Sequence, residues 1–228
     1  QIRHDQKLWR EFMIRAIGFD FDGTLIMSED KKAIVIQEIF QELHNTKKGI
    51  SKSYKELVGK GISRENKLKI IFKKHLKKEP TKTQLNKLNK EFSKHYETAL
   101  NTCPLFECTN IIKELTDQVN FLFLLSLENK TQVKNIAKHC KIAQYFNEIL
   151  GGPTSKITNL KHILKKHNLK PSQVIYIGDS SGDIIATHKL NVKTILIQKK
   201  FSYKKLKSVL QADFVFSSLC ELPKLKNL

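Results

Sequence analysis

The sequence predicts an α/β fold in which a parallel sheet with helices on both faces is interrupted by an inserted helical bundle. Three observations support it: an isolated apolar run at residues 14–19, a long block of helical periodicity after it, and short apolar runs alternating with amphipathic helical segments beyond Pro104. Such alternation is typical of parallel sheets, whose strands are buried on both faces. With 228 residues, 40% of them apolar, the chain can form one substantial core and a smaller second unit.

The first expected strand, at residues 14–19, is followed by a helical block from about Ser28 to Asn101. Apolar residues recur there at three-to-four spacing in three stretches, around Ile36 to Leu43, Leu68 to Leu76 and Leu85 to Leu100. The stretches are separated by helix breakers, and one residue is a candidate helix cap. The breakers are Gly49, the turn at residues 59–63 and Pro80, and the candidate cap is Thr81.

Beyond this block the sequence predicts the rest of the sheet domain. Strands are expected at 121–125, 148–150, 174–177, 192–197 and 214–216, and helices near 106–118, 130–139, 158–167, 182–190 and 203–210. The sheet domain is therefore expected to comprise residues 13–27 and 102–228, and the helical domain residues 28–101. Residues 1–12 are interpreted as an N-terminal extension or a cloning remnant, with Met13 as a sensible initiator.

Two pairs of acidic residues follow two of the expected strands at their carboxyl ends. Asp20-Phe21-Asp22-Gly23-Thr24-Leu25 follows the first strand, and Gly178-Asp179-Ser180-Ser181-Gly182-Asp183 follows the strand at 174–177. Sheets of this kind bind ligands at that edge, and four converging carboxylates can hold Mg²⁺ for phosphoryl transfer. A calcium-binding EF-hand loop is the alternative for the first pair, but its twelfth position would be Lys31 rather than glutamate.

The chain carries a formal net charge of +19 and has a pI of about 9.7. A basic balance of this size attracts phosphates, RNA or anionic membranes. Nucleic-acid sites usually combine arginine forks with aromatic platforms, whereas the excess here is nearly all lysine. The only arginines are Arg3, Arg10, Arg15 and Arg64. We therefore favour a solvated, compositionally biased surface over a nucleic-acid-binding face.

Other signals in the sequence are absent. No apolar stretch is long enough to span a bilayer and residues 1–12 are too polar for a signal-peptide core, so we expect a soluble cytoplasmic protein. Neither a complete phosphate-binding P-loop nor a histidine metal motif occurs. The cysteines lack zinc-site spacing and are expected to be reduced thiols. They are Cys103, Cys108, Cys140 and Cys220.

The acidic motifs resemble those of the haloacid dehalogenase superfamily, specifically its phosphatases with a helical cap inserted after the first motif. Residues 20–25 match the first motif of that family closely, and residues 178–183 match its fourth motif in the phosphatase form. The resemblance spans about residues 13–220. It implies a Rossmann-like α/β core with an inserted helical (C1) cap, and an active site that uses Mg²⁺.

By this resemblance Asp20 is the nucleophile and Asp22 the general acid and base. An aspartate that attacks phosphorus forms an acyl phosphate and so splits one difficult displacement into two easier ones. Asp22 would protonate the departing alkoxide and then deprotonate the attacking water. Mg²⁺ would be held by the Asp20 side chain, the Asp22 carbonyl, Asp179 and, directly or through water, Asp183. Gly23 and Thr24 would let the backbone turn sharply beside the phosphate. The alternative for Asp183 is an acid that only stabilises the first turn of a helix.

The resemblance adds two further catalytic residues. Ser126 ends the strand at 121–125 and would donate to a phosphate oxygen, although Leu127 and Glu128 depart from the commonest pattern. Glu128 is expected to turn away from the phosphate, and Ser126 can alternatively cap the next helix. Lys156 would balance charge between the nucleophile and the transferring phosphoryl group.

Within the helical block, Gly61-Ile62-Ser63-Arg64-Glu65 resembles the cap loop of β-phosphoglucomutase and related sugar-phosphate enzymes. In that loop the arginine contacts the substrate, so Arg64 is a candidate substrate-binding residue with Lys60 as a weaker companion. An ordinary position in the first turn of a helix is the equal alternative for Arg64.

The sequence thus predicts a Mg²⁺-dependent phosphatase that hydrolyses a small phosphorylated metabolite, with a sugar phosphate slightly preferred, through an aspartyl-phosphate intermediate. One alternative is a β-phosphoglucomutase-like phosphomutase, which the loop at residues 61–65 supports and the hydrolase form of residues 178–183 opposes. A second is a basic RNA- or anion-binding protein on an inactive scaffold, which the intact acid set opposes. The expected partner is the metabolite alone, without nucleic acid or membrane.

Overall fold

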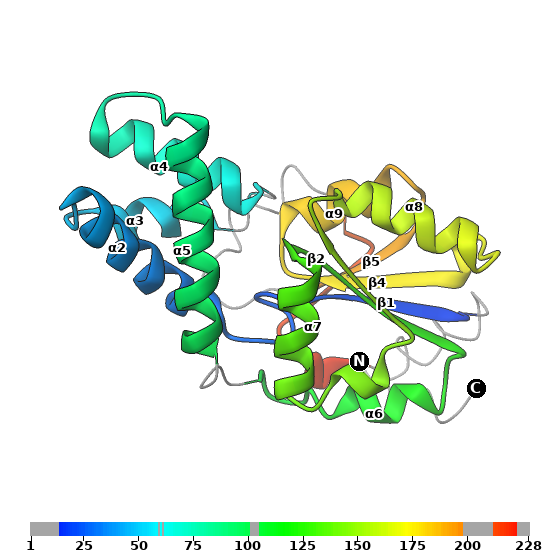
Figure 1. Ribbon diagram of the computed structural model, residues 1–228. Helices are drawn as coiled ribbons and strands as arrows, with labels where there is room; N and C mark the ends of the chain where they lie inside the picture. Colours follow the sequence, from blue (N-terminus) through cyan, green and yellow to red (C-terminus); the bar gives the residue numbers. More distant parts are fainter. Residues whose placement is uncertain (1–13, 59, 61, 101–104, 198–211, 223–228) are drawn as a thin grey trace. The chain divides into compact units, whose positions relative to one another are not determined.

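The structure is a computed structural model that describes residues 14–58, 60, 62–100, 105–197 and 212–222 (Figure 1). The chain divides into two compact units. One, called the sheet unit below, combines the residues up to Ile26 with those from Leu105 onward, and the other, the helical unit, runs from Met27 to Pro104. Several sequence expectations lie outside the described residues. They concern residues 1–12, Met13, Gly59, Gly61, Cys103 and the helix at 203–210.

Within the described residues, the sheet unit contains a six-stranded sheet in which every neighbouring pair is parallel. The order β3-β2-β1-β4-β5-β6 places β1 between β2 and β4 at the centre. Their carboxyl ends therefore meet at one edge, where such sheets bind ligands. The strands are β1 (Ala16–Asp20), β2 (Phe121–Asn129), β3 (Glu148–Gly152), β4 (Val174–Gly178), β5 (Lys193–Ile197) and β6 (Phe214–Phe216).

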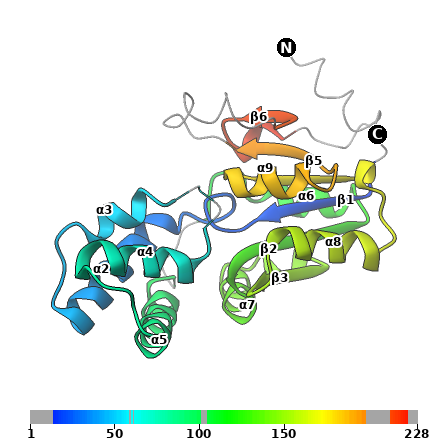
Figure 2. The same ribbon diagram turned by 90° about the horizontal axis from the view of Figure 1, so that it is seen from above.

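Helices cover both faces of this sheet, as the sequence predicts, so the α/β fold class is confirmed. The α-helices are α6 (Ile111–Thr116), α7 (Lys130–His139), α8 (Lys156–Lys166) and α9 (Ser181–His188), and short 3-10 helices lie at η1 (Ala143–Tyr145), η2 (Pro171–Gln173) and η3 (Leu219–Glu221). Figures 1 and 2 show α8 and α9 on one face and α6 and α7 on the other. β1 and β4 are buried along their whole length, which explains their nearly continuous apolar sequences.

The helical unit comprises α2 (Glu29–His44), α3 (Ile50–Lys55), α4 (Arg64–Leu76) and α5 (Lys82–Leu100). Its core is built from the apolar positions whose spacing indicates helices, including Ile36, Phe40, Leu68, Phe72, Phe92 and Tyr96. Thr81 precedes α5 and forms a capping box, because its hydroxyl accepts from the Gln84 amide at 3.2 Å while the Gln84 side chain accepts from the Thr81 amide at 2.9 Å. No helix in the described part of the chain combines the length and apolar character that crossing a bilayer requires.

The starts of two helices differ most from the sequence expectation. The helix expected near 106–118 is shorter, because the Phe106 amide donates to the Leu25 carbonyl at 3.0 Å and Leu105 forms an isolated β-bridge with Ile26. These contacts keep the start of the segment extended. The helix expected from 158 begins instead at Lys156, after Ser155 accepts a hydrogen bond from the Thr158 amide.

The expectation of reduced thiols is wrong for Cys108 and Cys220, which form a disulfide with their Cα atoms 5.2 Å apart. The two residues are separated by 112 positions, so no short cysteine spacing in the sequence indicates that they pair. The bridge arises because the fold brings the segment before α6 next to η3. Cys140 is a free thiol, as expected.

Candidate active site

The carboxyl ends of the three central strands bring the predicted site residues of the sheet unit together. Asp20 is the last residue of β1 and pairs in register with Leu125 of β2, so Ser126 follows directly beside it. Asp179 comes immediately after β4. Residues far apart in the sequence thus meet at one edge because parallel neighbours end at the same level.

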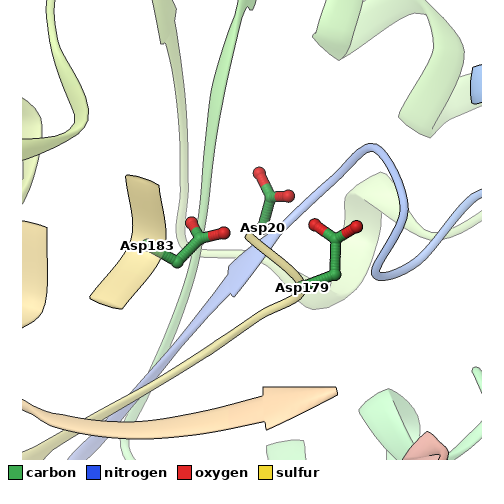
Figure 3. A group of neighbouring side chains, drawn as sticks. All are labelled: Asp20, Asp179 and Asp183. Carbon is green, nitrogen blue, oxygen red and sulfur yellow. The ribbon is translucent and has the colours of Figure 1, made fainter. Parts of the chain in front are cut away.

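Three carboxylates converge at this edge. Asp20, Asp179 and Asp183 each offer an oxygen atom that lies within 4.8 Å of those of the other two, and Figure 3 shows the three side chains approaching from β1, from the loop after β4, and from α9. Asp20 is 5% exposed and Asp183 is fully buried. Like charges held this closely out of water are costly unless cations lie among them.

Lys156 supplies one such cation. Its Nζ lies 2.5 Å from Oδ1 of Asp20 and 2.5 Å from Oδ1 of Asp183, although its side chain is only 8% exposed. Burial lowers the pKa of Lys156, but the carboxylates of Asp183 and Asp20 outweigh burial and hold the pKa above its ordinary value. The ammonium is therefore charged at neutral pH.

Asp20 lies in an environment that disfavours its negative charge, even though the Lys156 ammonium is next to it. Burial raises the pKa of Asp20 well above its ordinary value, Lys156 opposes this shift, and the carboxylates of Asp183 and Asp179 add to it. A further cation among these oxygens would relieve the remaining repulsion.

The second oxygen of Asp183 is held by Ser180. Asp183 Oδ2 accepts hydrogen bonds from the Ser180 amide at 3.0 Å and from its hydroxyl at 2.5 Å, which completes a capping box at the start of α9. Asp183 therefore takes the helix-stabilising role that was the alternative for it, and it also binds Lys156, while ligation of Mg²⁺ by Asp183 stays a prediction. Ser180 was not among the residues predicted for the site, although its spacing from Asp183 is the capping-box signal.

Ser126 lies beside the second acid of the first motif. Its Oγ donates to Oδ2 of Asp22 at 3.4 Å and accepts from the Glu128 amide at 3.1 Å. The alternative that Ser126 caps the next helix is wrong, because Asn129 is the N-cap of α7 and its side chain accepts from the Thr131 amide at 2.9 Å. Glu128, which was expected to turn away from the phosphate, is buried.

The loop after Asp22 is a tight turn. Gly23 has a φ of 85°, and the Leu25 amide donates to the Phe21 carbonyl at 2.9 Å. Thr24 is buried, and its hydroxyl oxygen has no hydrogen-bond partner among the described residues. An unpartnered buried hydroxyl is costly, so a bound group that accepts from it would stabilise the loop.

The donor set at this edge fits a hard divalent cation. Its side-chain donors are all carboxylate oxygens, and Mg²⁺ prefers oxygen ligands and keeps several waters. Asp20 and Asp179 are the side chains best suited to ligate it. Asp183 is already bound by Lys156 and Ser180, which suits contact through water.

Arg64 and Lys60 belong to the helical unit. Arg64 is the first residue of α4, behind the N-cap Ser63, and its guanidinium lies 4.8 Å from the centroid of the Phe92 ring. Lys60 is exposed. Substrate binding by either residue stays a prediction.

Known proteins resemble this chain in both sequence and fold. The model of the haloacid dehalogenase-like hydrolase family matches residues 17–197. A phosphoglycolate phosphatase of Haemophilus influenzae (strain 86-028NP) is 24% identical over 220 residues, which cover 91% of this chain and 96% of that protein.

Solved structures share the fold at lower identity. A predicted phosphoglycolate phosphatase from Haemophilus somnus 129PT superposes with a TM-score of 0.74 at 23% identity, covering 90% of this chain and 94% of the other. CbbY from Rhodobacter sphaeroides, solved in complex with phosphate, gives a TM-score of 0.76 at 18% identity and covers 95% of this chain and 99% of its own.

Proposed function

The chain belongs to the haloacid dehalogenase-like hydrolase family and is a phosphoric monoester hydrolase, and we propose that it hydrolyses a small phosphorylated metabolite through an aspartyl-phosphate intermediate on Asp20. The observation that carries the proposal is the group of Asp20, Asp179 and Asp183 at the carboxyl edge of the sheet, with Lys156 inserted between two of them. This arrangement joins a nucleophile, a cation site and a fixed positive charge, which phosphoryl transfer requires.

In the first step an oxygen of Asp20 attacks phosphorus, the bond from phosphorus to the ester oxygen breaks, and Asp22 protonates the departing alkoxide. In the second step water attacks the phosphorus of the aspartyl phosphate and gives its proton to Asp22. The acyl-phosphate bond then breaks, which releases inorganic phosphate and regenerates Asp20. Ser126 lies within 3.4 Å of Asp22 and can turn its hydroxyl toward a phosphate oxygen.

Mg²⁺ is the proposed metal, held by Asp20, Asp179 and the Asp22 carbonyl, with Asp183 acting through water. Its chemistry when bound is to reduce the repulsion between the anionic substrate and Asp20. The side chain of Asp22 is outside the three-carboxylate group, which agrees with its assignment as acid and base. Lys156 contributes a second positive charge, which comes from a side chain and not from the metal.

The substrate class is proposed as a small metabolite with a phosphate monoester. Relatives named phosphoglycolate phosphatases support this class, and the unpartnered hydroxyl of Thr24 beside the motif supports binding of an acceptor such as phosphate there. A cytoplasmic location stays a prediction, and the Cys108–Cys220 disulfide weighs against it because disulfides persist mainly in oxidising compartments.

A phosphate-release screen tests the proposal. Phosphoglycolate, hexose phosphates and nucleoside monophosphates are offered to the wild type with and without Mg²⁺. We expect Mg²⁺-dependent release of free phosphate, loss of release in Asp20→Asn, and a decrease of about 10²- to 10⁴-fold in Asp22→Asn. Asp117→Asn, which removes an exposed carboxylate of the sheet unit, serves as the matched control and should retain activity.

Two outcomes would overturn the proposal. Equal phosphate release by the wild type and Asp20→Asn would show that Asp20 is not the nucleophile. Formation of an isomeric phosphate ester in place of free phosphate would identify a phosphomutase instead.

A further inference from the structure

The outer edge of β3 borders a groove that the proposed reaction does not use. β3 is an edge strand, and within the described residues β2 is the only strand that pairs with it. Figure 2 shows β3 on the side of the sheet away from β6, with α7 next to it. The groove, called the basic groove below, is lined by residues of α7, of β3 and of the end of α8, and has a volume of about 380 Å³. This volume lies in the range of ligand-binding pockets.

The side chains that line the basic groove are mainly cationic. Lys130, Lys134 and Lys138 are exposed and follow one another at four-residue spacing, so they form a row along one face of α7. Lys166 of α8 adds a fourth ammonium group, and it binds the one acid that lines the groove, Glu148, at 2.5 Å. The three lysines of α7 form no ion pair with an acid of the described residues. Their charge therefore remains available to an anionic partner.

The edge of β3 offers backbone hydrogen-bonding groups to the same groove. Every second residue of an edge strand in a parallel sheet directs its N–H and C=O groups away from the neighbouring strand. The Asn147 amide donates to the Leu122 carbonyl at 2.8 Å, so the residues with outward backbone groups are Glu148 and Leu150. Both of them line the basic groove. An extended peptide can pair with such an edge as an additional strand.

The spacing of the lysine row matches that of side chains on an extended chain. Residues four apart on an α-helix are separated by about 6 Å along its axis. On a strand, side chains two residues apart point to the same face and are separated by about 6.5–7 Å. Acidic side chains at every second position of a strand beside β3 therefore meet successive lysines of α7.

A nucleic acid fits the basic groove less well than a peptide. Single strands are usually bound by aromatic stacking platforms and arginines. The one aromatic residue among those that line the groove is Phe146, which is only 9% exposed, and none of them is an arginine. An acidic peptide uses both the lysine row and the open strand edge, whereas a nucleic acid uses only the charge.

We propose that the basic groove is a docking site for an acidic segment of a partner protein. The segment adds as a strand to the edge of β3 and places alternate glutamate or aspartate side chains against Lys130, Lys134 and Lys138. Backbone pairing supplies the affinity, and the lysines select acidic sequences. This inference goes beyond the proposed function, because it involves none of the residues that the reaction uses.

Fluorescence anisotropy of a labelled synthetic peptide tests the inference. In the probe, glutamate and threonine alternate; the reference peptide has the same composition with its glutamates in one block. We expect the alternating peptide to bind more tightly, and its affinity to fall about fivefold in the double variant Lys134→Gln with Lys138→Gln. The matched control, Lys113→Gln with Lys161→Gln, removes the same charge from exposed positions of α6 and α8 and should bind as the wild type does.

Hydrogen exchange provides a second readout, which separates strand addition from simple charge attraction. The alternating peptide should slow exchange of the Glu148 and Leu150 amides, because both would then be hydrogen-bonded. Unchanged exchange at both amides would overturn the inference, and so would an equal loss of affinity in the two double variants.

A single-stranded RNA oligonucleotide is the competing ligand. If it binds through Lys134 and Lys138 while the alternating peptide does not bind, the inference is wrong and the groove is a nucleic-acid-binding surface. None of these measurements needs turnover. Absence of phosphate release by the wild type would instead overturn the proposed function, so the two failures are distinguishable.

Discussion

Lys156 occupies a position that its own helix disfavours. It is the first residue of α8, where the helix dipole repels a cation, and its side chain is buried. Two carboxylates at 2.5 Å offset both costs. A buried pair of this kind is weak evidence for stability, because well-packed apolar residues often stabilise a core as much. The arrangement is therefore better explained by the proposed reaction than by folding.

At Gly23, substitution by alanine should abolish most activity. The residue has a φ of 85°, and a Cβ atom there would lie 2.2 Å from Oδ2 of Asp179. The side chain of Asp179 or the turn after Asp22 must therefore move. Either movement disturbs the group formed by Asp20, Asp179 and Asp183. We expect Gly23→Ala to lower kcat/KM about a hundredfold or more in the phosphate-release assay.

Gly49→Ala is the matched control for this prediction. Gly49 also has a positive φ, 78°, so alanine there carries a similar backbone cost. The added Cβ atom, however, would lie 3.2 Å from a ring carbon of His75, its nearest atom. We expect Gly49→Ala to lower the melting temperature while leaving kcat/KM nearly unchanged. Equal loss of activity in both variants would attribute the Gly23 effect to backbone strain alone.

The site residues were predictable where they belong to short motifs of contiguous residues. Asp20, Asp22 and Asp179 belong to motifs whose paired acids indicate a metal site and whose resemblance to the family implies a nucleophile, and the structure brings Asp20 and Asp179 together. The contact of Lys156 with Asp183 was not predictable, because a single lysine in so basic a chain gives no sign of burial. Its two carboxylate partners come from β1 and α9 and meet it only through the tertiary fold.

At the level of elements, strand positions followed closely from apolar runs bounded by turns. β4 was expected at 174–177 and spans Val174–Gly178, because buried parallel strands leave continuous apolar sequence. The order of the strands was not predictable, since neighbours along the chain need not be neighbours in the sheet. The extended start of the segment before α6 was also missed, because its pairing with Leu25 and Ile26 overrides local helical periodicity.

The helical unit contains two histidines that favour the neutral state. The His44 ring lies edge-on to Phe72 at 5.1 Å between centroids, and its buried Nε2 has no hydrogen-bond partner among the residues described. The Nε2 atom of His75 lies 2.8 Å from the Ser53 hydroxyl. Burial lowers the pKa of both imidazoles, and nearby ammonium groups act in the same direction, while Glu56 opposes the shift at His75. These groups are Lys78 and Lys87 at His44, and Lys74 and Lys77 at His75.

We therefore expect the stability of the helical unit to decrease as the pH falls below about 6.5. Both histidines have a lower pKa in the folded state, so the unfolded chain gains protons first as the pH falls through the ordinary value of 6.5. Their contribution is complete above that pH and is lost as the pH approaches the folded-state values. Thermal unfolding followed by circular dichroism at about pH 7.5 and about pH 5.5 measures the decrease.

A double variant, His44→Gln with His75→Gln, should show a shallower pH dependence of the melting temperature. His162→Gln, on the exposed face of α8, is the control and should keep the wild-type dependence. If the double variant loses as much stability as the wild type over the same pH range, other groups carry the effect.

At the scale of the whole molecule, the Cys108–Cys220 disulfide links two segments of the sheet unit. One is the segment that follows the helical unit in the sequence, and the other is the last described segment, at η3. Phe106, two residues before Cys108, donates to Leu25 at 3.0 Å, and Leu25 donates to Phe21 at 2.9 Å in the turn that follows Asp20. The bridge therefore tethers a segment that is hydrogen-bonded to the turn after Asp20. Its main physical effect is on the unfolded chain, whose conformational freedom a long closed loop reduces.

Reduction of this disulfide should lower the free energy of unfolding by about 2–4 kcal/mol, because it opens a loop that spans a sequence separation of 112 residues. Denaturant unfolding with and without a thiol reductant measures the change. Cys108→Ser should reproduce the reduced wild type without reductant, since it removes the same link. Cys140→Ser removes a free thiol and should leave the difference between oxidised and reduced protein intact. If the oxidised wild type and Cys108→Ser unfold at the same denaturant concentration, packing around η3 rather than the bridge holds the two segments together, and the loop-closure argument fails.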